Sequence, residues 1–211
     1  MNADSPALPA RRKEVEIKLP VTDVAAMRRR LQKLGFTLDQ RRRLEVNWLF
    51  DDDHGSLRAD GLLLRLRKAG REWLLTYKGP SIPGPHKSRE ESETKLANGD
   101  EMRLILDALG YRETFVYERY RTTFVLGSGA RKGEAVIDET PIGNYLELEG
   151  APAWIDRLAA ALGFEPSQYI LQSYATLFQQ YIGVHHLPAR NFTFADLDAA
   201  RQANQRRRKK R

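Results

Sequence analysis

The sequence has no cysteine among its 211 residues. This absence excludes disulfide-stabilised folds, cysteine-ligated zinc or iron–sulfur sites, and catalytic thiols. No apolar run approaches the roughly 20 residues that a membrane-spanning helix requires, and the polar start at residues 1–13 lacks the apolar centre of a signal peptide. We therefore expect a cytoplasmic protein without a membrane span, in which any metal is bound through oxygen or histidine.

Acidic residues are absent from positions 201–211, where seven lysines and arginines lie. The formal net charge of the whole chain is +7, so residues 1–200 are neutral as a set. We expect this basic tail to be a solvated, disordered arm, with non-specific contact to nucleic acid or anionic lipid as the less favoured alternative. The excess positive charge is thus a property of the tail and not of a folded basic surface.

Alternating polar and apolar residues predict a fold rich in strands. Eight strands are predicted, at 14–19, 44–50, 62–68, 72–78, 88–93, 115–124, 135–138 and 144–149. Helices are predicted at 22–34, 99–109, 152–162, 166–181 and about 194–205. Hairpin-like spacing without regular strand–helix alternation indicates an α+β fold, an eight-stranded antiparallel β-barrel with helices packed outside. We expect a flexible N-terminus at 1–13, a barrel domain at 14–182, and a C-terminal extension with the basic tail at 183–211.

Charged residues recur on one face of the predicted strands. Residues i and i+2 of a strand point the same way, so Glu14, Glu16 and Lys18 lie opposite an apolar face. The same spacing groups further pairs and triplets, namely Arg65 with Arg67, Thr76 with Lys78, Arg89 with Glu91 and Glu93, Arg119 with Arg121, and Glu147 with Glu149. One such strand is an ordinary solvated face. Six together predict that the apolar faces meet the helices and the charged faces line the barrel.

The signs of these charges indicate what the barrel binds. Two carboxylates about 4 Å apart repel by roughly 4 kcal/mol at an effective dielectric of 20, and a divalent cation removes that cost. Oxygen ligands without clustered histidine favour Mg²⁺ or Mn²⁺ over zinc, while arginine and lysine match phosphate oxygens. The combination predicts a site for a metal-bound nucleotide or polyphosphate.

The same residues resemble the signature of a known family. Glu14-Val15-Glu16-Ile17-Lys18 is similar to the ExExK motif of the CYTH superfamily, the triphosphate tunnel metalloenzymes, which includes class IV adenylyl cyclases and thiamine triphosphatases. Further matches follow in the family's order: Leu64–Arg67, Thr76–Pro80, Arg89–Glu93, Tyr117–Arg121, Asp138 with Pro141 and Gly143, Glu147–Gly150, and Ser173-Tyr174. They cover about residues 14–178 and imply an eight-stranded tunnel with charged walls.

The resemblance implies a role for each matching side chain. The implied metal ligands are Glu14, Glu16, Asp138, Glu147 and Glu149. The implied triphosphate-binding residues are Lys18, Arg65, Arg67, Lys78, Arg119 and Arg121, and we predict that Arg89 also binds the triphosphate. Lys78 and Glu91 are the candidates for catalytic proton transfer. Arg119 departs from the lysine that many relatives carry there, and a guanidinium does not accept a proton.

Three functions remain open at this point. The sequence leans towards a class IV adenylyl cyclase-like enzyme that converts ATP into cyclic AMP and pyrophosphate, because 76–80, 88–93 and 138–141 look like bacterial sequences of that group. The alternatives are a hydrolase of inorganic tripolyphosphate or an organic triphosphate such as thiamine triphosphate, and a non-catalytic module that binds polyphosphate or nucleotide. The oligomeric state is equally open, with a homodimer as one option.

Two further groups have structural interpretations. Surface positions are expected for His54, His86, His185 and His186, because they lie in turn-like segments without metal-ligand spacing. Core packing against the barrel is expected for Tyr169, Tyr174, Phe178 and Tyr181, because they follow helical periodicity.

Overall fold

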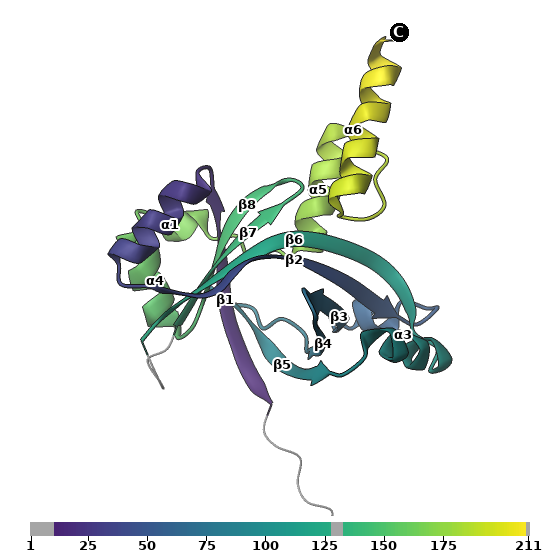
Figure 1. Cartoon of the computed structure of the whole chain (residues 1–211), viewed down its shortest axis with the longest axis horizontal. Helices are drawn as coiled ribbons and strands as arrows, with labels where there is room; N and C mark the ends of the chain where they lie inside the picture. Colours follow the sequence, from purple (N-terminus) through teal and green to yellow (C-terminus); the bar gives the residue numbers. More distant parts are fainter. Residues whose placement is uncertain (1–10, 128–132, 210–211) are drawn as a thin grey trace, which may run out of the picture.

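The computed structural model describes residues 11–127 and 133–209, which fold around a closed β-barrel (Figure 1). Eight strands occur in these residues: β1 (Arg12–Val21), β2 (Thr37–Asp51), β3 (Leu63–Ala69), β4 (Glu72–Lys78), β5 (Lys87–Leu96), β6 (Arg112–Leu126), β7 (Gly133–Thr140) and β8 (Gly143–Glu149). Neighbouring strands are antiparallel in the order β1-β5-β4-β3-β2-β6-β7-β8, and β8 pairs with β1 to close the barrel. The predicted α+β fold with an eight-stranded antiparallel barrel is confirmed.

The helices lie outside the barrel or at one end of it (Figure 1). They are α1 (Val24–Lys33), α2 (Ser56–Ala59), α3 (Gly99–Ala108), α4 (Pro152–Ala161), α5 (Tyr174–His185) and α6 (Phe194–Lys209), with a short 3₁₀ turn, η2, at Pro166–Gln168. Asp23 caps α1 by accepting a hydrogen bond from the amide of Ala26, and Asn98 caps α3 in the same way. None of the helices in the described ranges is long and apolar enough to cross a membrane.

The apolar faces of the strands meet the helices, as the alternation predicts. Ile17 and Leu19 of β1 are fully buried beneath α1 and α4, in one cluster with residues of β7 and β8. On the other flank, α3 covers Leu66 and Trp73 of β3 and β4. Because successive strand residues alternate in direction, burying these apolar faces outside turns the charged faces into the barrel.

The prediction of a helix at 166–181 is wrong for the first half of this range. The chain forms the turn η2 and then runs extended, and Ile170 exchanges two backbone hydrogen bonds with Lys18 of β1 (2.9 and 3.1 Å). The pairing of β1 with β5 ends at Glu16 and Lys87. The bonds to Ile170 therefore provide partners for the backbone N–H and C=O of Lys18, which lies beyond that pairing. The helix α5 begins only at Tyr174, where Ser173 caps it.

The segment between α5 and α6 packs against strand β6 of the barrel. Phe192 is fully buried between α5 and β6, and its backbone bonds to Val116 and Glu118 (both 2.9 Å). The expected disorder of the basic tail is wrong for residues 201–209, because α6 continues through Lys209 and projects beyond α5 (Figure 1). Leu197 and Ala200 anchor the start of α6, and arginine and lysine are good helix formers that allow it to continue. Residues 210 and 211 of the tail lie outside the described residues.

Two side chains differ from their expected structural roles. His86 is buried, not exposed, because the loop before β5 packs against α4, where Asp156 Oδ1 accepts a hydrogen bond from His86 Nε2 (2.8 Å). Phe178 is in the core as expected. Tyr174 packs in the same cluster but also lines the interior of the barrel.

Candidate active site

The barrel surrounds a cavity of about 750 Å³ with a mostly ionic wall. Its lining includes twelve lysines and arginines and nine glutamates. Every residue that the sequence predicts for the site lines this cavity except Asp138. The charged faces of separate strands, far apart in the sequence, are thus brought together around one space.

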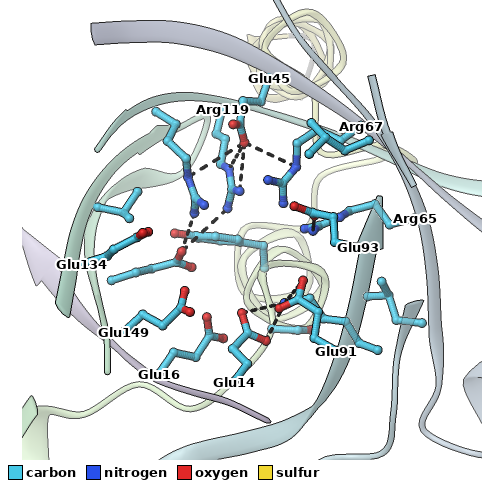
Figure 2. Close-up of a pocket in the computed structure, with 18 of the residues that line it drawn as sticks. Glu14, Glu16, Glu45, Arg65, Arg67, Glu91, Glu93, Arg119, Glu134 and Glu149 are labelled. Carbon is cyan, nitrogen blue, oxygen red and sulfur yellow. Dashed lines mark hydrogen bonds and ion pairs between the residues drawn. The ribbon is translucent and has the colours of Figure 1, made fainter. Parts of the chain in front are cut away.

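Carboxylates are concentrated on the wall formed by β1 and β8. The strand register places Glu16 opposite Glu149 and Lys18 opposite Glu147, and Figure 2 shows Glu14, Glu16 and Glu149 next to one another. Lys18 bridges this wall, with Nζ 3.1 Å from Glu16 Oε1 and 3.3 Å from Glu147 Oε1. The wall combines several hard oxygen donors with a buried cation that partly neutralises them.

The two candidates for proton transfer lie beside this wall. Lys78 Nζ is 2.7 Å from Glu14 Oε1 and 3.3 Å from Glu91 Oε1. Lys87, which the sequence analysis did not identify, bonds to Glu16 Oε1 at 2.5 Å. Burial lowers the pKa of Lys87 to about 8, although Glu16 opposes this effect. Lys87 was missed because it is the first residue of β5 and precedes the predicted strand at 88–93.

Asp138 occupies a different position from the other four predicted metal ligands. It is fully buried, and both of its oxygens are engaged: Oδ1 accepts from Arg121 Nε (2.7 Å), while Oδ2 accepts from Arg119 Nη1 (3.0 Å) and the Tyr174 hydroxyl (2.8 Å). In this arrangement Asp138 holds two arginines in place behind the cavity surface. Its role as a metal ligand stays a prediction.

Arginines from β3 and β6 form the opposite wall around a carboxylate that the sequence analysis did not identify. Glu45 of β2 is 1% exposed and accepts hydrogen bonds from Arg119 Nε (3.0 Å) and Nη2 (2.9 Å). Arg67 Nε and Arg121 Nε lie 3.7 and 3.9 Å from the same oxygen. Figure 2 shows Arg67 and Arg119 on either side of Glu45. Burial alone would raise the pKa of Glu45, but these guanidinium groups outweigh burial and hold it well below its usual range. The i, i+2 rule applied to the predicted strand at 44–50 would have placed Glu45 and Asn47 on the inner face.

Negative charge is in excess near Glu149. Burial raises the pKa of Glu149 to about 7, and the neighbouring carboxylates of Glu14, Glu134 and Glu16 add to this shift, while Arg12 opposes it. No three carboxylate or imidazole groups in residues 11–127 and 133–209 already form a cluster that could hold a metal ion. The carboxylates are paired with lysines and arginines: Lys78 with Glu14, Lys18 with Glu16 and Glu147, and Arg12 with Glu149. The donors nevertheless fit a hard divalent cation, because they are oxygen ligands whose mutual repulsion a cation would relieve.

Replacing Glu149 with glutamine is expected to stabilise the metal-free protein at pH 8 by on the order of 2 kcal/mol. The folded-state pKa of about 7 lies above the ordinary value of 4.5, which means that folding favours the protonated form of Glu149 over the ionised form. Its ionisation costs stability as the pH rises from about 4.5 to 7. Melting in EDTA checks this: the difference between variant and wild type should be present at pH 8 and absent at pH 4.5. A variant less stable than wild type at pH 8 would contradict it.

The chain is similar to known proteins of one family. The profile of the CYTH domain family matches residues 12–162. The protein named "Putative adenylate cyclase MJ0240" from Methanocaldococcus jannaschii is 32% identical over 137 residues, which cover 64% of this chain and 75% of the relative. A solved structure from Vibrio parahaemolyticus with the same type of name aligns with a TM-score of 0.71 at 18% identity, over 81% of this chain and 99% of that one. HpAC1 from Hippeastrum, whose description states a dominant triphosphatase activity, aligns at 0.56 and 19% identity, over 80% and 95%.

Proposed function

The chain belongs to the CYTH domain family, and from this premise we propose that it is a divalent-metal-dependent enzyme that hydrolyses a triphosphate. The division of one cavity into a carboxylate wall on β1 and β8 and an arginine wall on β3 and β6 carries the proposal. Twelve basic against nine acidic lining residues give the cavity an excess of positive charge, which suits an anionic metal–triphosphate complex. Phosphoryl transfer needs mainly positioning and charge neutralisation, and such walls supply both.

Glu14, Glu16, Glu147 and Glu149 are the residues that would hold Mg²⁺ or Mn²⁺. When bound there, the metal would polarise a phosphoryl oxygen and make a bound water more acidic. Lys78 is hydrogen-bonded to Glu14 and close to Glu91, so it is placed to hold or pass on a proton at the edge of this wall. Its neighbours therefore support the role that the sequence assigns to Lys78 and Glu91.

The guanidinium groups of Arg65, Arg67, Arg119 and Arg121 would bind the phosphates across the cavity. Each presents fixed N–H donors that match phosphate oxygens. Glu45 and Asp138 hold Arg119 from two sides, which orients its donors before any substrate arrives. Such prior positioning stabilises developing negative charge without reorganisation of the site during the reaction.

Hydrolysis fits the lining better than nucleotide cyclisation. Among the described lining residues the aromatic side chains are Tyr117 and Tyr174, and both belong to the cluster packed beneath α5 and α6. The cavity therefore offers many charges for phosphates but few aromatic faces on which a nucleobase could stack. Adenylyl cyclase activity is the second candidate, because a relative that is 32% identical bears that name. The triphosphatase activity stated for HpAC1, which shares the fold, is in line with the first candidate.

Phosphorus NMR tests the proposal directly. Purified protein is incubated with inorganic tripolyphosphate and, separately, with ATP, first in Mg²⁺ and then in Mn²⁺, with the Glu147→Gln variant as blank. Release of orthophosphate only when metal is present supports a hydrolase. Cyclic AMP with pyrophosphate would replace the proposal by the cyclase candidate. Unchanged spectra for both substrates would leave a binding module.

Replacing Arg65 with alanine is expected to raise KM for the triphosphate by about 10- to 150-fold, which corresponds to 1.5 to 3 kcal/mol for a charged hydrogen bond. Arg65 points into the cavity, where it donates to Thr76 and Tyr117 (both 3.1 Å). Steady-state kinetics measure the change, with Arg103→Ala as control because Arg103 lies outside the barrel and pairs with Glu113. An unchanged KM for the Arg65 variant would remove it from the phosphate-binding wall.

A further inference from the structure

Tyr117 is a buried phenol on the arginine wall to which the proposed function gives no role. It is 7% exposed and lines the cavity. Its hydroxyl oxygen accepts a hydrogen bond from Arg65 Nη1 at 3.1 Å. Within the described parts of the chain the same hydroxyl donates no hydrogen bond to another residue. The hydroxyl oxygen lies against a guanidinium group, while its O–H has no acceptor among the described residues. An incoming anionic oxygen would supply that acceptor.

Cationic groups face this phenol from two strands. The register places Arg67 of β3 and Tyr117 of β6 on either side of Asn47 in β2, and Arg67 Nε is fixed by Asn47 Oδ1 at 3.0 Å. The Arg119 guanidinium carbon lies 5.9 Å from the centre of the Tyr117 ring. From α5, the facing titratable group is Tyr174, whose own hydroxyl is committed to Asp138. The carboxylates that face the same arginines are Glu93 of β5, 3.4 Å from Arg65 Nη2, and Glu45 of β2, which pairs with Arg67 and Arg119. The charges that act most strongly on the phenol itself are those of the three arginines.

These surroundings change the acidity of the phenol. Burial would raise the pKa of Tyr117, but Arg65, Arg119 and Arg67 outweigh burial and lower it to about 8. With this pKa, the ligand-free protein is expected to contain both phenol and phenolate forms of Tyr117 near pH 8. A triphosphate bound by the same arginines brings negative charge, which reverses the balance and favours the neutral phenol.

We propose that Tyr117 is a ligand of the triphosphate and that it takes up one proton from solvent as the phosphates bind. The neutral phenol then donates its O–H to a phosphate oxygen, while Arg65 keeps donors for both the phenol and the phosphates. The oxygen–hydrogen bond formed on the phenolate is the only covalent change, and its proton comes from the buffer. This inference rests on the proposed function, since it requires triphosphate in the cavity.

Spectroscopy of the ligand-free protein gives the first test. Tyrosinate absorbs ultraviolet light at longer wavelength than tyrosine, so ionisation of one residue is visible in a difference spectrum between pH 7 and 9. We expect one tyrosinate to form near pH 8 in the wild type and in a Tyr111→Phe control, whose ring packs outside the barrel. The Tyr117→Phe variant keeps the ring and its packing, and it should lack this transition. Equal melting temperatures of the two variants would show that both are folded.

Calorimetry gives the second test. Inorganic tripolyphosphate is titrated at pH 8 in EDTA, which prevents turnover, in two buffers of different ionisation enthalpy. Wild type and Tyr111→Phe should take up about half a proton more per bound tripolyphosphate than Tyr117→Phe, because a group at its pKa is half ionised. Tyr117→Phe should also bind more weakly at pH 7.

The outcomes separate this inference from the proposed function. Binding of tripolyphosphate with equal proton uptake in wild type and Tyr117→Phe would overturn the role of Tyr117 and leave the triphosphate site intact. Failure of wild type and control to bind tripolyphosphate in EDTA would overturn the ligand role of Tyr117, even if the tyrosinate transition were observed. The proposed function is decided separately, by phosphorus NMR in the presence of Mg²⁺ or Mn²⁺. Absence of that transition in the wild type would overturn the proton uptake.

Discussion

Replacing Glu147 with glutamine is expected to reduce turnover of the triphosphate substrate by about 100-fold or more. Changes in groups that merely support a metal ligand typically cost 10- to 100-fold in metal affinity or activity, and Glu147 is placed among the proposed ligands themselves. Glutamine keeps the size of the side chain but removes the anionic oxygens that a hard cation prefers. The loss should appear in kcat measured at saturating substrate, together with weaker Mn²⁺ binding in calorimetry.

The Glu147 variant should remain folded, so that the loss of activity can be assigned to the site. Glu147 is paired with Lys18 and Arg121, but Lys18 also contacts Glu16 and Arg121 also bonds to Asp138. We therefore expect a loss of about 1 to 3 kcal/mol, as for one removed partner among several. Burial would raise the pKa of Glu147, but Arg121 and Lys18 lower it to about 2. Its contribution to stability is present above pH 4.5 and disappears as the pH falls towards 2.

Glu139→Gln is the matched control for this variant. Glu139 lies on β7, pairs with Arg42 outside the cavity, and is partly exposed. It should retain wild-type turnover and metal binding, because an exposed ion pair contributes little. Wild-type turnover in the Glu147 variant itself would contradict the metal wall on β1 and β8.

The sequence was sufficient to predict the barrel and most of its charged lining, for a physical reason. A strand has a period of two, so Glu14 and Glu16 must share a face once β1 forms, whatever the rest of the chain does. Counting charged doublets found these positions, but it overlooked isolated charges. Glu45 has Asn47 as its neighbour on the inner face, and Tyr117 is not charged in its usual state. Both required the same rule applied to every inward residue, not only to pairs of charges.

Other features depend on contacts between distant segments, which no local pattern contains. Asp138 is enclosed because Arg121 of β6 is its register partner and α5 brings Tyr174 against it. The helix predicted at 166–181 forms only in its second half. In the first half Ile170 pairs with Lys18, about 150 residues earlier in the chain, and this contact overrides the local periodicity. Burial of His86 likewise depends on Asp156 in α4. These positions follow from tertiary structure that overrides local preference.

Replacing Glu45 with glutamine is expected to destabilise the ligand-free protein by about 3 kcal/mol, the lower end for breaking a buried ion pair. Glu45 is the carboxylate nearest to Arg119 and also attracts Arg67 and Arg121. The pKa of Arg67 is already lowered to about 10, first by burial and then by Arg65 and Arg119. Removing the charge of Glu45 therefore leaves several buried guanidinium groups facing one another with fewer anions between them.

Inorganic tripolyphosphate distinguishes this electrostatic cause from a simple packing defect. If repulsion among the arginines destabilises the Glu45→Gln variant, a bound polyanion should restore more stability to the variant than it adds to the wild type. Differential scanning calorimetry with and without tripolyphosphate measures both shifts, and Glu72→Gln is the control. Glu72 also lines the cavity and pairs with Arg43 and Lys95, but it is 42% exposed and should cost less than about 1 kcal/mol. An equal tripolyphosphate shift in wild type and the Glu45 variant would refute the electrostatic account, because a cavity or a lost hydrogen bond would not respond to an anion. A larger shift in the variant would mean that Glu45 supplies, in the ligand-free protein, the negative charge that bound phosphates supply in the complex. The arginine wall would then need an anion for stability whether or not substrate is bound.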